Sequence, residues 1–305
     1  MALRIGIPRG LLYYYYGEIW CRYFERLGVQ VVVSGETTRS MIDQGGKIDE
    51  VCLPVKVYIG HACALKDKVD FLFIPRVVSV AAAQYNCPKI IGLPDIVRSN
   101  FPELPPLLDV EINMRKGRYD LYRAVVEMGK KFGKSPLSSL TAWLRAVRLA
   151  RSAQARPMQE INSVQVGLVG HPYILNDSQV SMDIAGKLAR LGVSVVGAGA
   201  VDDKDLVKAT RQLPKKIFWH YCQRLAGAAL ALMHFPQPPL DGIIFVTSFA
   251  CGPDSLVGEV LGWHARQLNI PVLMLTLDEH TGEAGLVTRL EAFTDMLGRR
   301  KKLCW

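Results

Sequence analysis

The stretches RIGIPRG at residues 4–10 and QVGLVGHP at residues 165–172 begin two segments that follow the same pattern. Each stretch reads as a short apolar strand, and a helical segment follows it, YYYYGEIWCRYFERLG at 13–28 and SQVSMDIAGKLARLG at 178–192. Both helical segments end on Arg-Leu-Gly-Val, with glycine where the end of a helix favours it, and run into a β-branched strand. The chain therefore contains an internal repeat.

The repeat extends beyond these segments. VDFLFIPRVV at 69–78 corresponds to DGIIFVTSFA at 241–250, and PKIIGLPD, which ends at Asp95, corresponds to PVLMLTLDEH, which contains Asp278. These strands are apolar throughout and are separated by helical stretches, a pattern typical of buried parallel sheets. We predict an α/β protein with two doubly wound parallel-sheet domains.

The predicted boundaries follow from where the pattern stops. The first α/β domain spans 1–110, since FPELPP interrupts the pattern near its end, and the second spans 164–305. Residues 111–163 read as basic helices interrupted by FGKSPLSS. We expect this segment to be a helical connector between the two domains.

Composition limits the function classes. The chain has 305 residues, about half of them apolar, and no run reaches the roughly 18 to 20 uncharged apolar residues of a membrane helix. The N-terminal residues do not resemble a signal peptide, so we expect a cytoplasmic protein. Thiols stay reduced there, and the seven cysteines are therefore expected to be core residues, metal ligands or redox groups rather than disulfides.

The net charge of +9 is localised rather than spread along the chain. RRKK at 299–302 forms one basic patch, and a larger one lies in the middle segment: Arg115, Lys116, Arg118, Arg123, Lys130, Lys131, Lys134, Arg145, Arg148 and Arg151. This segment reads either as a solvated helix face or as an electrostatic dock for a phosphorylated ligand or an acidic protein. No nucleic-acid-binding module accompanies the charge, so nucleic acid is not an expected partner.

Three cysteines lie beside a proline at the edge of an apolar segment: Cys52 in DEVCLPVK, Cys87 in QYNCPKII and Cys251 in VTSFACGPDS. Cys251 and Cys87 follow predicted strands and belong to the carboxyl edge of a sheet, where open parallel sheets bind their ligands. Cys52 precedes a predicted helix, whose free N–H groups favour a thiolate. We expect the three thiols to converge on one cleft.

Three separated cysteines suit a 4Fe-4S cluster that leaves one iron open to water or substrate. A structural zinc site usually has four ligands and a CxxC pair, and the chain contains neither that pair nor the four-cysteine runs of ferredoxins. The alternative is that these cysteines are core residues, since cysteine is among the most commonly buried residue types.

The remaining cysteines favour structural roles. Cys21 lies in an aromatic helix and is expected in the core. Cys63 and Cys222 also fall on predicted helices, where each is either a core residue or an additional ligand. Cys304 lies in the C-terminal tail and is expected to be exposed.

Polar residues follow several of the predicted strands. Asp278, Glu279 and His280 either supply an acid or base beside the open iron, or form a helix cap with solvated neighbours. Arg9 and His171 follow the first strand of each repeat and are candidates for binding an anion, a cofactor or a substrate carbonyl.

Several of these motifs occur together, in order, in one known family. The first half, through VCLPVK, NCPK and IIGLPDIV, resembles the domain of unknown function of large acyl-CoA dehydratase activases. The second half resembles the same family in VGLVGHPYILND, IFWHYCQRLAGAA, FACGPDS and LDEHTGEAGLVTRLEAF. The family is related to the subunits of 2-hydroxyacyl-CoA dehydratases and benzoyl-CoA reductases and to double-cubane cluster proteins.

This resemblance implies two flavodoxin-like (Rossmann-like) domains with an iron-sulfur cluster between them. Carried over by motif, the cluster ligands are Cys52, Cys87 and Cys251. The implied role is a low-potential reductase-type component, in which the open iron also acts on a thioester or hydroxyl oxygen of a small-molecule substrate. A non-catalytic electron carrier or cluster scaffold, and a zinc-binding or metal-free binding protein, are the alternatives.

The chain also departs from the large activases. The large activases carry actin-like ATPase domains ahead of this region, whereas the sequence here starts at the first predicted strand and contains no Walker loop. GAGAVDD at 197–203 has only the beginning of a dinucleotide fingerprint, so no directly bound nucleotide is expected. The expected partner is an ATP-dependent activase in trans, and the relatives suggest a homodimer.

Overall fold

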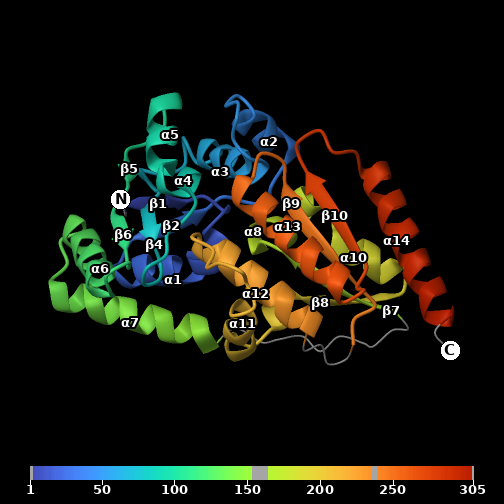
Figure 1. The fold of residues 1–305 in the computed structure, drawn as a ribbon. Helices are drawn as coiled ribbons and strands as arrows, with labels where there is room; N and C mark the ends of the chain where they lie inside the picture. Colours follow the sequence, from blue (N-terminus) through green and yellow to red (C-terminus); the bar gives the residue numbers. More distant parts are fainter. Residues whose placement is uncertain (1–2, 153–163, 235–238, 304–305) are drawn as a thin grey trace. The chain divides into compact units, whose positions relative to one another are not determined.

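The structure is a computed structural model that describes residues 3–152, 164–234 and 239–303 (Figure 1). The chain separates into two compact units, Met1–Ala155 and Arg156–Trp305. Each unit has its own four-stranded sheet covered by helices. Among the described helices, none combines the length and the apolar composition that crossing a bilayer requires.

The two sheets have the same strand order. In space, the first runs β2 (Gln30–Val33), β1 (Arg4–Ile7), β3 (Phe71–Phe73), β5 (Leu107–Leu108), and the second runs β8 (Val193–Gly197), β7 (Val164–Gly170), β9 (Gly242–Ser248), β10 (Val272–Leu277). All neighbouring strands are parallel. The prediction of an α/β fold with parallel sheets is confirmed.

The repeated Arg-Leu-Gly-Val has the same local structure in both units. It ends α1 (Tyr13–Arg26) in the first and α10 (Ile184–Arg190) in the second. Gly28 and Gly192 follow these ends with φ of +77° and +72°, a left-handed conformation that only glycine adopts without strain. The glycines therefore turn the chain from each helix into the edge strand of each sheet.

Three details of the predicted repeat are wrong. PKIIGLPD is not a strand but two helices, α4 (Pro88–Ile91) and α5 (Leu93–Asn100), because Pro88 and Pro94 occupy first-turn positions that suit proline. The strand predicted over 69–78 is divided after β3, and β4 (Arg76–Ser79) pairs with β6 (Glu111–Asn113) in a separate parallel sheet.

The third error concerns the helix predicted over 178–192. It is divided into α9 (Ser178–Ser181) and α10, because Met182 and Asp183 between them have φ of 50° and 52°. The Asp183 side chain accepts a hydrogen bond from the Gly186 N–H and so caps α10. Asp183 therefore interrupts the predicted helix through its backbone conformation and caps the start of α10 through its side chain.

An aromatic core holds the first unit together. Trp20 of α1 packs against Phe73 and Trp143, with ring centroids 4.6 and 4.8 Å apart, and it also contacts Tyr23 and Phe24. Trp143 belongs to α7 (Pro136–Ser152), which packs with α6 (Tyr119–Lys131) against α1. The described part of the predicted connector thus packs into the first unit, a contact that its basic composition did not predict.

The basic residues of this segment lie on its surface. The exposed ones are Arg115, Lys116, Arg118, Arg123, Lys130, Lys131, Arg145 and Arg148. Lys134 is half-buried, and the Arg151 side chain lies outside the described residues. Exposure on this scale fits a solvated helix face, while the docking role stays a prediction.

Two glycines bring α2 (Arg39–Gly45) and α3 (Leu53–Cys63) into backbone contact. A Cβ on Gly45 would overlap the Lys56 carbonyl of α3, and a Cβ on Gly60 would overlap the Met41 carbonyl of α2. Each helix therefore has a glycine where the backbone of the other helix approaches it. These two contacts hold α3 in position against α2.

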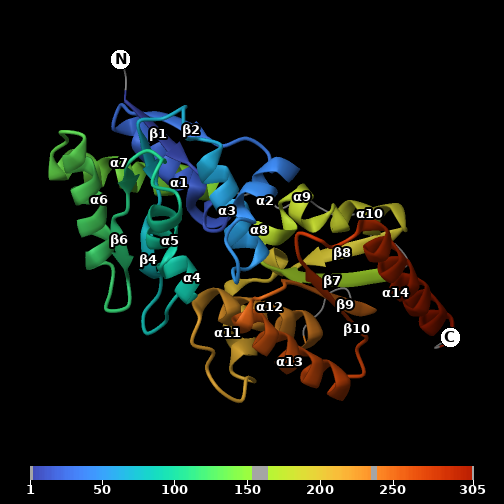
Figure 2. The ribbon, with the colours of Figure 1, turned by 90° about the horizontal axis from the view of Figure 1, so that it is seen from above.

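Helices cover both faces of the second sheet. On one face, α12 (His220–His234) and α13 (Gly252–Gln267) form an apolar core with β7 and β9, and α10 and α14 (Glu283–Leu303) lie on the other (Figure 2). The shorter helical elements of this unit are α8 (Pro172–Leu175), η1 (Ala198–Ala200) and α11 (Asp203–Thr210).

Candidate metal centre

A buried group of polar side chains lies at the carboxyl edge of the second sheet. His171 directly follows β7, and Thr247 is near the end of β9. Asp254 lies in the first turn of α13, which follows β9, and Cys222 lies in the first turn of α12. Parallel strands place their carboxyl ends at one edge, so residues far apart in the sequence meet here.

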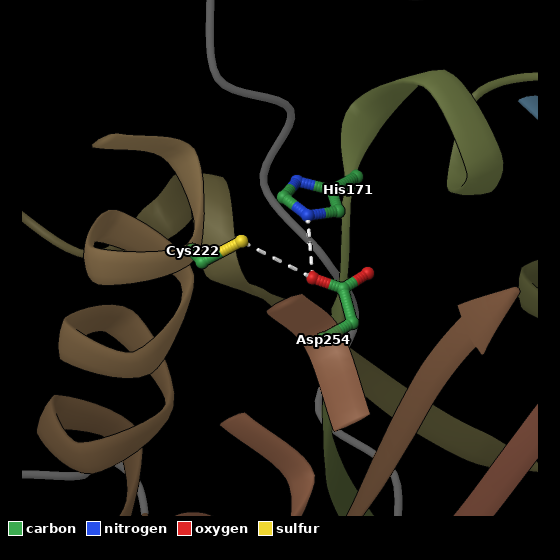
Figure 3. A group of neighbouring side chains, drawn as sticks. All are labelled: His171, Cys222 and Asp254. Atoms are coloured by element: carbon green, nitrogen blue, oxygen red, sulfur yellow. Dashed lines mark hydrogen bonds and ion pairs between the residues drawn. The ribbon is translucent and has the colours of Figure 1, made fainter. Parts of the chain in front are cut away.

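Asp254 is the centre of this group (Figure 3). Its Oδ1 is 2.9 Å from His171 Nε2 and accepts a hydrogen bond from the Cys222 Sγ at 3.4 Å. Its Oδ2 accepts a hydrogen bond from the Thr247 hydroxyl at 3.4 Å. Both carboxylate oxygens are thereby held by side chains from separate elements.

The group is removed from solvent. The exposed fractions of His171, Asp254 and Cys222 are 2%, 1% and 5%. Burial raises the pKa of Asp254, but the charge and the hydrogen bond of His171, with smaller contributions from Cys251 and Cys222, outweigh burial and leave that pKa below its usual value. Asp254 is therefore a buried carboxylate that keeps its negative charge at neutral pH.

These side chains could hold a metal ion. One ligand atom from each of His171, Cys222 and Asp254 lies within 4.8 Å of the others. Imidazole nitrogen, thiolate sulfur and carboxylate oxygen are the atoms with which proteins bind transition metals. The ring of His171 also stacks on Tyr173, with centroids 4.7 Å apart, which fixes its orientation.

The three predicted cluster ligands share one local structure. Cys52, Cys87 and Cys251 are the N-cap residues of α3, α4 and α13, and each helix has proline in its first turn. The backbone carbonyl of each cysteine accepts the first helical hydrogen bonds. The other cysteines that the structure describes, Cys21, Cys63 and Cys222, lie within helices.

The three N-cap cysteines are distributed over the two units. Cys52 is buried and Cys87 is half-buried, both in the first unit, and the half-buried Cys251 belongs to the second. Asn86 fixes the chain before Cys87, because its amide group and its backbone N–H donate to the carbonyls of Val77 and Val78. That the three thiols share one site stays a prediction.

The predicted acid-base residues lie in the turn after β10. The Asp278 carboxylate accepts hydrogen bonds from the His280 N–H and the Thr281 hydroxyl, each at about 2.9 Å or less. The bond from Thr281 is the main cause that lowers the pKa of Asp278. The Glu279 side chain is 20% exposed and that of His280 is 81% exposed. Asp278 therefore organises the turn, and a catalytic role of the three residues stays a prediction.

Arg9 follows the first strand of the first unit, as predicted. Its backbone N–H donates to the Ser34 hydroxyl, and its guanidinium forms an ion pair with Glu36, the main cause that raises the pKa of Arg9. An incoming anion would therefore compete with Glu36. Binding of a cofactor or substrate by Arg9 stays a prediction.

Sequence reasoning missed Asp254 and Thr247, and it treated Cys222 only as an optional ligand. A signal for Asp254 was present, because the residue follows Cys251 by three positions and so falls in the first turn of a helix at the sheet edge. Its partner His171 is 83 residues away along the chain, and the sequence alone does not pair them.

The comparison with known families identifies the chain at a coarse level. Residues 4–201 match the family described as the CoA enzyme activase uncharacterised domain (DUF2229). The chain belongs to this family. The matched region includes Cys52, Cys87 and His171 and ends before the other residues of the candidate metal centre. A search of curated proteins finds no match.

The reactivity of Cys21 tests its structural role. Burial, with a smaller effect of Glu25, raises the pKa of this thiol to about 11. Because the thiolate is the reacting species, we expect iodoacetamide at pH 8 to alkylate Cys21 about a hundredfold more slowly in the folded than in the urea-unfolded protein. Mass spectrometry of peptides over a time course measures both rates. Cys21 is half-buried and packs against the aromatic core, and equal rates would contradict that packing.

Proposed function

We propose that the chain binds a 4Fe-4S cluster through Cys52, Cys87 and Cys251. In this proposal, it serves as a low-potential reductase-type component related to the 2-hydroxyacyl-CoA dehydratases. The observation that carries the proposal is that these three cysteines, unlike the other described ones, each begin a helix that has proline in its first turn.

The local structure fits thiolate ligands. The free N–H groups and the dipole of a helix N-terminus stabilise negative charge, and iron-sulfur clusters are bound by cysteine thiolates. A residue before proline is kept from helical backbone angles, and Cys87, which directly precedes Pro88, has φ of −57° and ψ of 139°.

The fold supports the same proposal. When the strands of each four-stranded sheet are numbered along the chain, their order in space is 2-1-3-4. Flavodoxin-like sheets have the order 2-1-3-4-5, so both sheets match the first four strands of that order. Such sheets bind ligands beyond the carboxyl ends of their strands, the edge at which Cys251 lies in the second unit. We therefore propose two flavodoxin-like domains that each supply cluster ligands.

The proposed chemistry needs both the cluster and residues of the chain. When bound by three thiolates, such a cluster supplies one-electron transfer and an iron with an open position for a substrate oxygen. Of the predicted acid-base residues, Glu279 is the proposed proton carrier, at Oε1, because its side chain is 20% exposed whereas that of His280 is 81% exposed. Arg9 would hold an anionic substrate group, with Glu36 displaced.

The proposed electron donor is a separate ATP-driven activase. Membership in the CoA enzyme activase domain family supports a partner enzyme of this kind. The proposed substrate is a small molecule, a CoA thioester by the relationship to the dehydratases.

Iron and acid-labile sulfide measured on anaerobically prepared chain test the proposal. We expect about four of each per chain in the parent and a loss of nearly all in Cys251→Ala, Cys52→Ser and Cys87→Ser. Cys21→Ser is the matched control and should keep the parent content, because Cys21 lies within α1. A parent without iron and sulfide after anaerobic reconstitution, or a Cys251→Ala variant that keeps both, would refute the cluster.

A further inference from the structure

We propose that His171, Cys222 and Asp254 form a second, mononuclear metal site that takes zinc or a similar divalent transition metal. The site uses none of the three proposed cluster ligands and lies entirely within the second unit. It therefore goes beyond the proposed cluster, and its donor atoms are tested apart from the cluster ligands, although the Cys251 side chain also forms a hydrogen bond with Asp254.

The spacing of the donor atoms fits one small ion. With bonds of about 2.0–2.3 Å, the ligand atoms of a tetrahedral zinc site lie roughly 3.3–3.8 Å apart. Here Asp254 Oδ1 is 2.9 Å from His171 Nε2 and 3.4 Å from Cys222 Sγ, and all three atoms lie within 4.8 Å. Side-chain adjustments of less than about 1.5 Å would bring all three atoms to such distances.

The elements that carry the ligands are fixed independently of an ion. His171 is the N-cap of α8, Asp254 lies in the first turn of α13, and Cys222 lies on α12, which packs into the apolar core. The Thr247 hydroxyl donates to Oδ2 of Asp254 and so orients the carboxylate from its other side. Such an outer contact is a common feature of protein metal sites.

Charge and burial favour a cation at this place. The Asp254 carboxylate is 1% exposed, and both of its oxygens accept hydrogen bonds from buried side chains of separate elements. A buried charge is costly unless an opposite charge or a metal compensates it. On metal binding, Nε2 and Sγ would become ligands, and their protons would be released to solvent.

The ligand types select the class of metal. A set of one nitrogen, one sulfur and one oxygen suits Zn²⁺ and its borderline neighbours, whereas Mg²⁺ and Ca²⁺ prefer oxygen throughout. Three protein ligands leave a fourth position of a tetrahedral ion for water or a substrate atom. The site would therefore have the composition of a reactive rather than a purely structural zinc site.

Cobalt is the probe for the test, because a Co²⁺–thiolate bond gives a near-ultraviolet charge-transfer band. We would add Co²⁺ to the full chain carrying Cys52→Ser and Cys87→Ser, which removes two of the proposed cluster ligands. We expect one Co²⁺ per chain, with the thiolate band present and displaced by Zn²⁺. Adding Cys222→Ser should abolish the band and weaken Zn²⁺ binding at least about 100-fold.

Matched variants assign the ligands. His171→Gln should weaken binding as Cys222→Ser does, whereas Cys21→Ser and Cys63→Ser, which change cysteines of the first unit, should keep the band. Absence of Co²⁺ binding, or a band that survives Cys222→Ser, would overturn the site. Zn²⁺ should also slow alkylation of Cys222 in the parent chain, a test that needs no substitution. Unprotected Cys222 in the presence of excess Zn²⁺ would overturn the site equally.

The two proposals fail separately. Loss of the cobalt site with iron and sulfide retained in the parent would refute only the mononuclear centre. Cobalt bound through Cys222, in a chain that takes up no iron or sulfide, would refute only the cluster.

Discussion

Replacing Trp20 with alanine should lower the free energy of unfolding of the first unit by about 3–5 kcal/mol. Trp20 is 6% exposed and contacts four aromatic rings from α1, β3 and α7. Removing the indole leaves a cavity that these rings, on three separate elements, cannot close together. Protection of the α1 and α7 amides against hydrogen exchange, read by mass spectrometry, measures the loss.

An exposed aromatic residue of the same unit provides the control. Tyr119, at the start of α6, is 78% exposed, and Tyr119→Ala should change the stability by no more than about 0.5 kcal/mol. If Trp20→Ala were as mild as this control, the aromatic cluster would not be the main core of the unit, and the packing of α7 on α1 would need another explanation.

The Gly60→Ala substitution should destabilise the first unit by about 3 kcal/mol or more. The added methyl group would overlap the Met41 carbonyl, and since that atom is backbone, α2 and α3 must move apart to admit it. Gly45→Ala should act in the same way from the opposite helix, through the Lys56 carbonyl. Hydrogen exchange of the α2 and α3 amides should rise in both variants.

Gly298→Ala tests the effect of the same change without the contact. Gly298 is helical, and a Cβ there meets nothing within 4 Å, so alanine should be neutral or stabilise α14 by up to about 1 kcal/mol. A Gly60→Ala variant as stable as the parent would show that α2 and α3 do not touch through these glycines.

Much of the architecture followed from local patterns. The repeated Arg-Leu-Gly-Val predicted two equivalent helix-to-strand turns. Gly28 and Gly192 form these turns with a positive φ, a conformation that glycine adopts more easily than other residues, so the sequence itself marks the turns. Apolar runs without alternation predicted the parallel sheets for a similarly local reason.

Predictions were wrong where one local signal outweighed another. Residues 88–95 are as apolar as a buried strand, but Pro88 and Pro94 act as helix starts and no strand forms. Apolar content alone does not separate the two structures over so short a run. The fourth strand of the four-stranded sheet is instead the two-residue β5, which is too short to give a sequence pattern.

The metal centre was only partly predictable. His171 stood out because β7 ends directly before it, and Cys222 was recognised only as an optional ligand. The contacts of Asp254 with His171 and with Cys222 depend on how α12 and α13 pack on the sheet. Side-chain contacts between segments that are distant in the sequence produce no hydrophobic periodicity, so a single sequence does not reveal them.

The prolines that follow the N-cap cysteines have a consequence for how metal would be acquired. In each case the cysteine is an N-cap residue with a non-helical backbone, and proline in the first turn limits extension of the helix towards it. The ligand segments would thus have lost their chain entropy during folding of the polypeptide itself. Uptake of iron would then be a binding reaction to prepared partners, with little change of secondary structure, unlike the small domains that fold only around their metal.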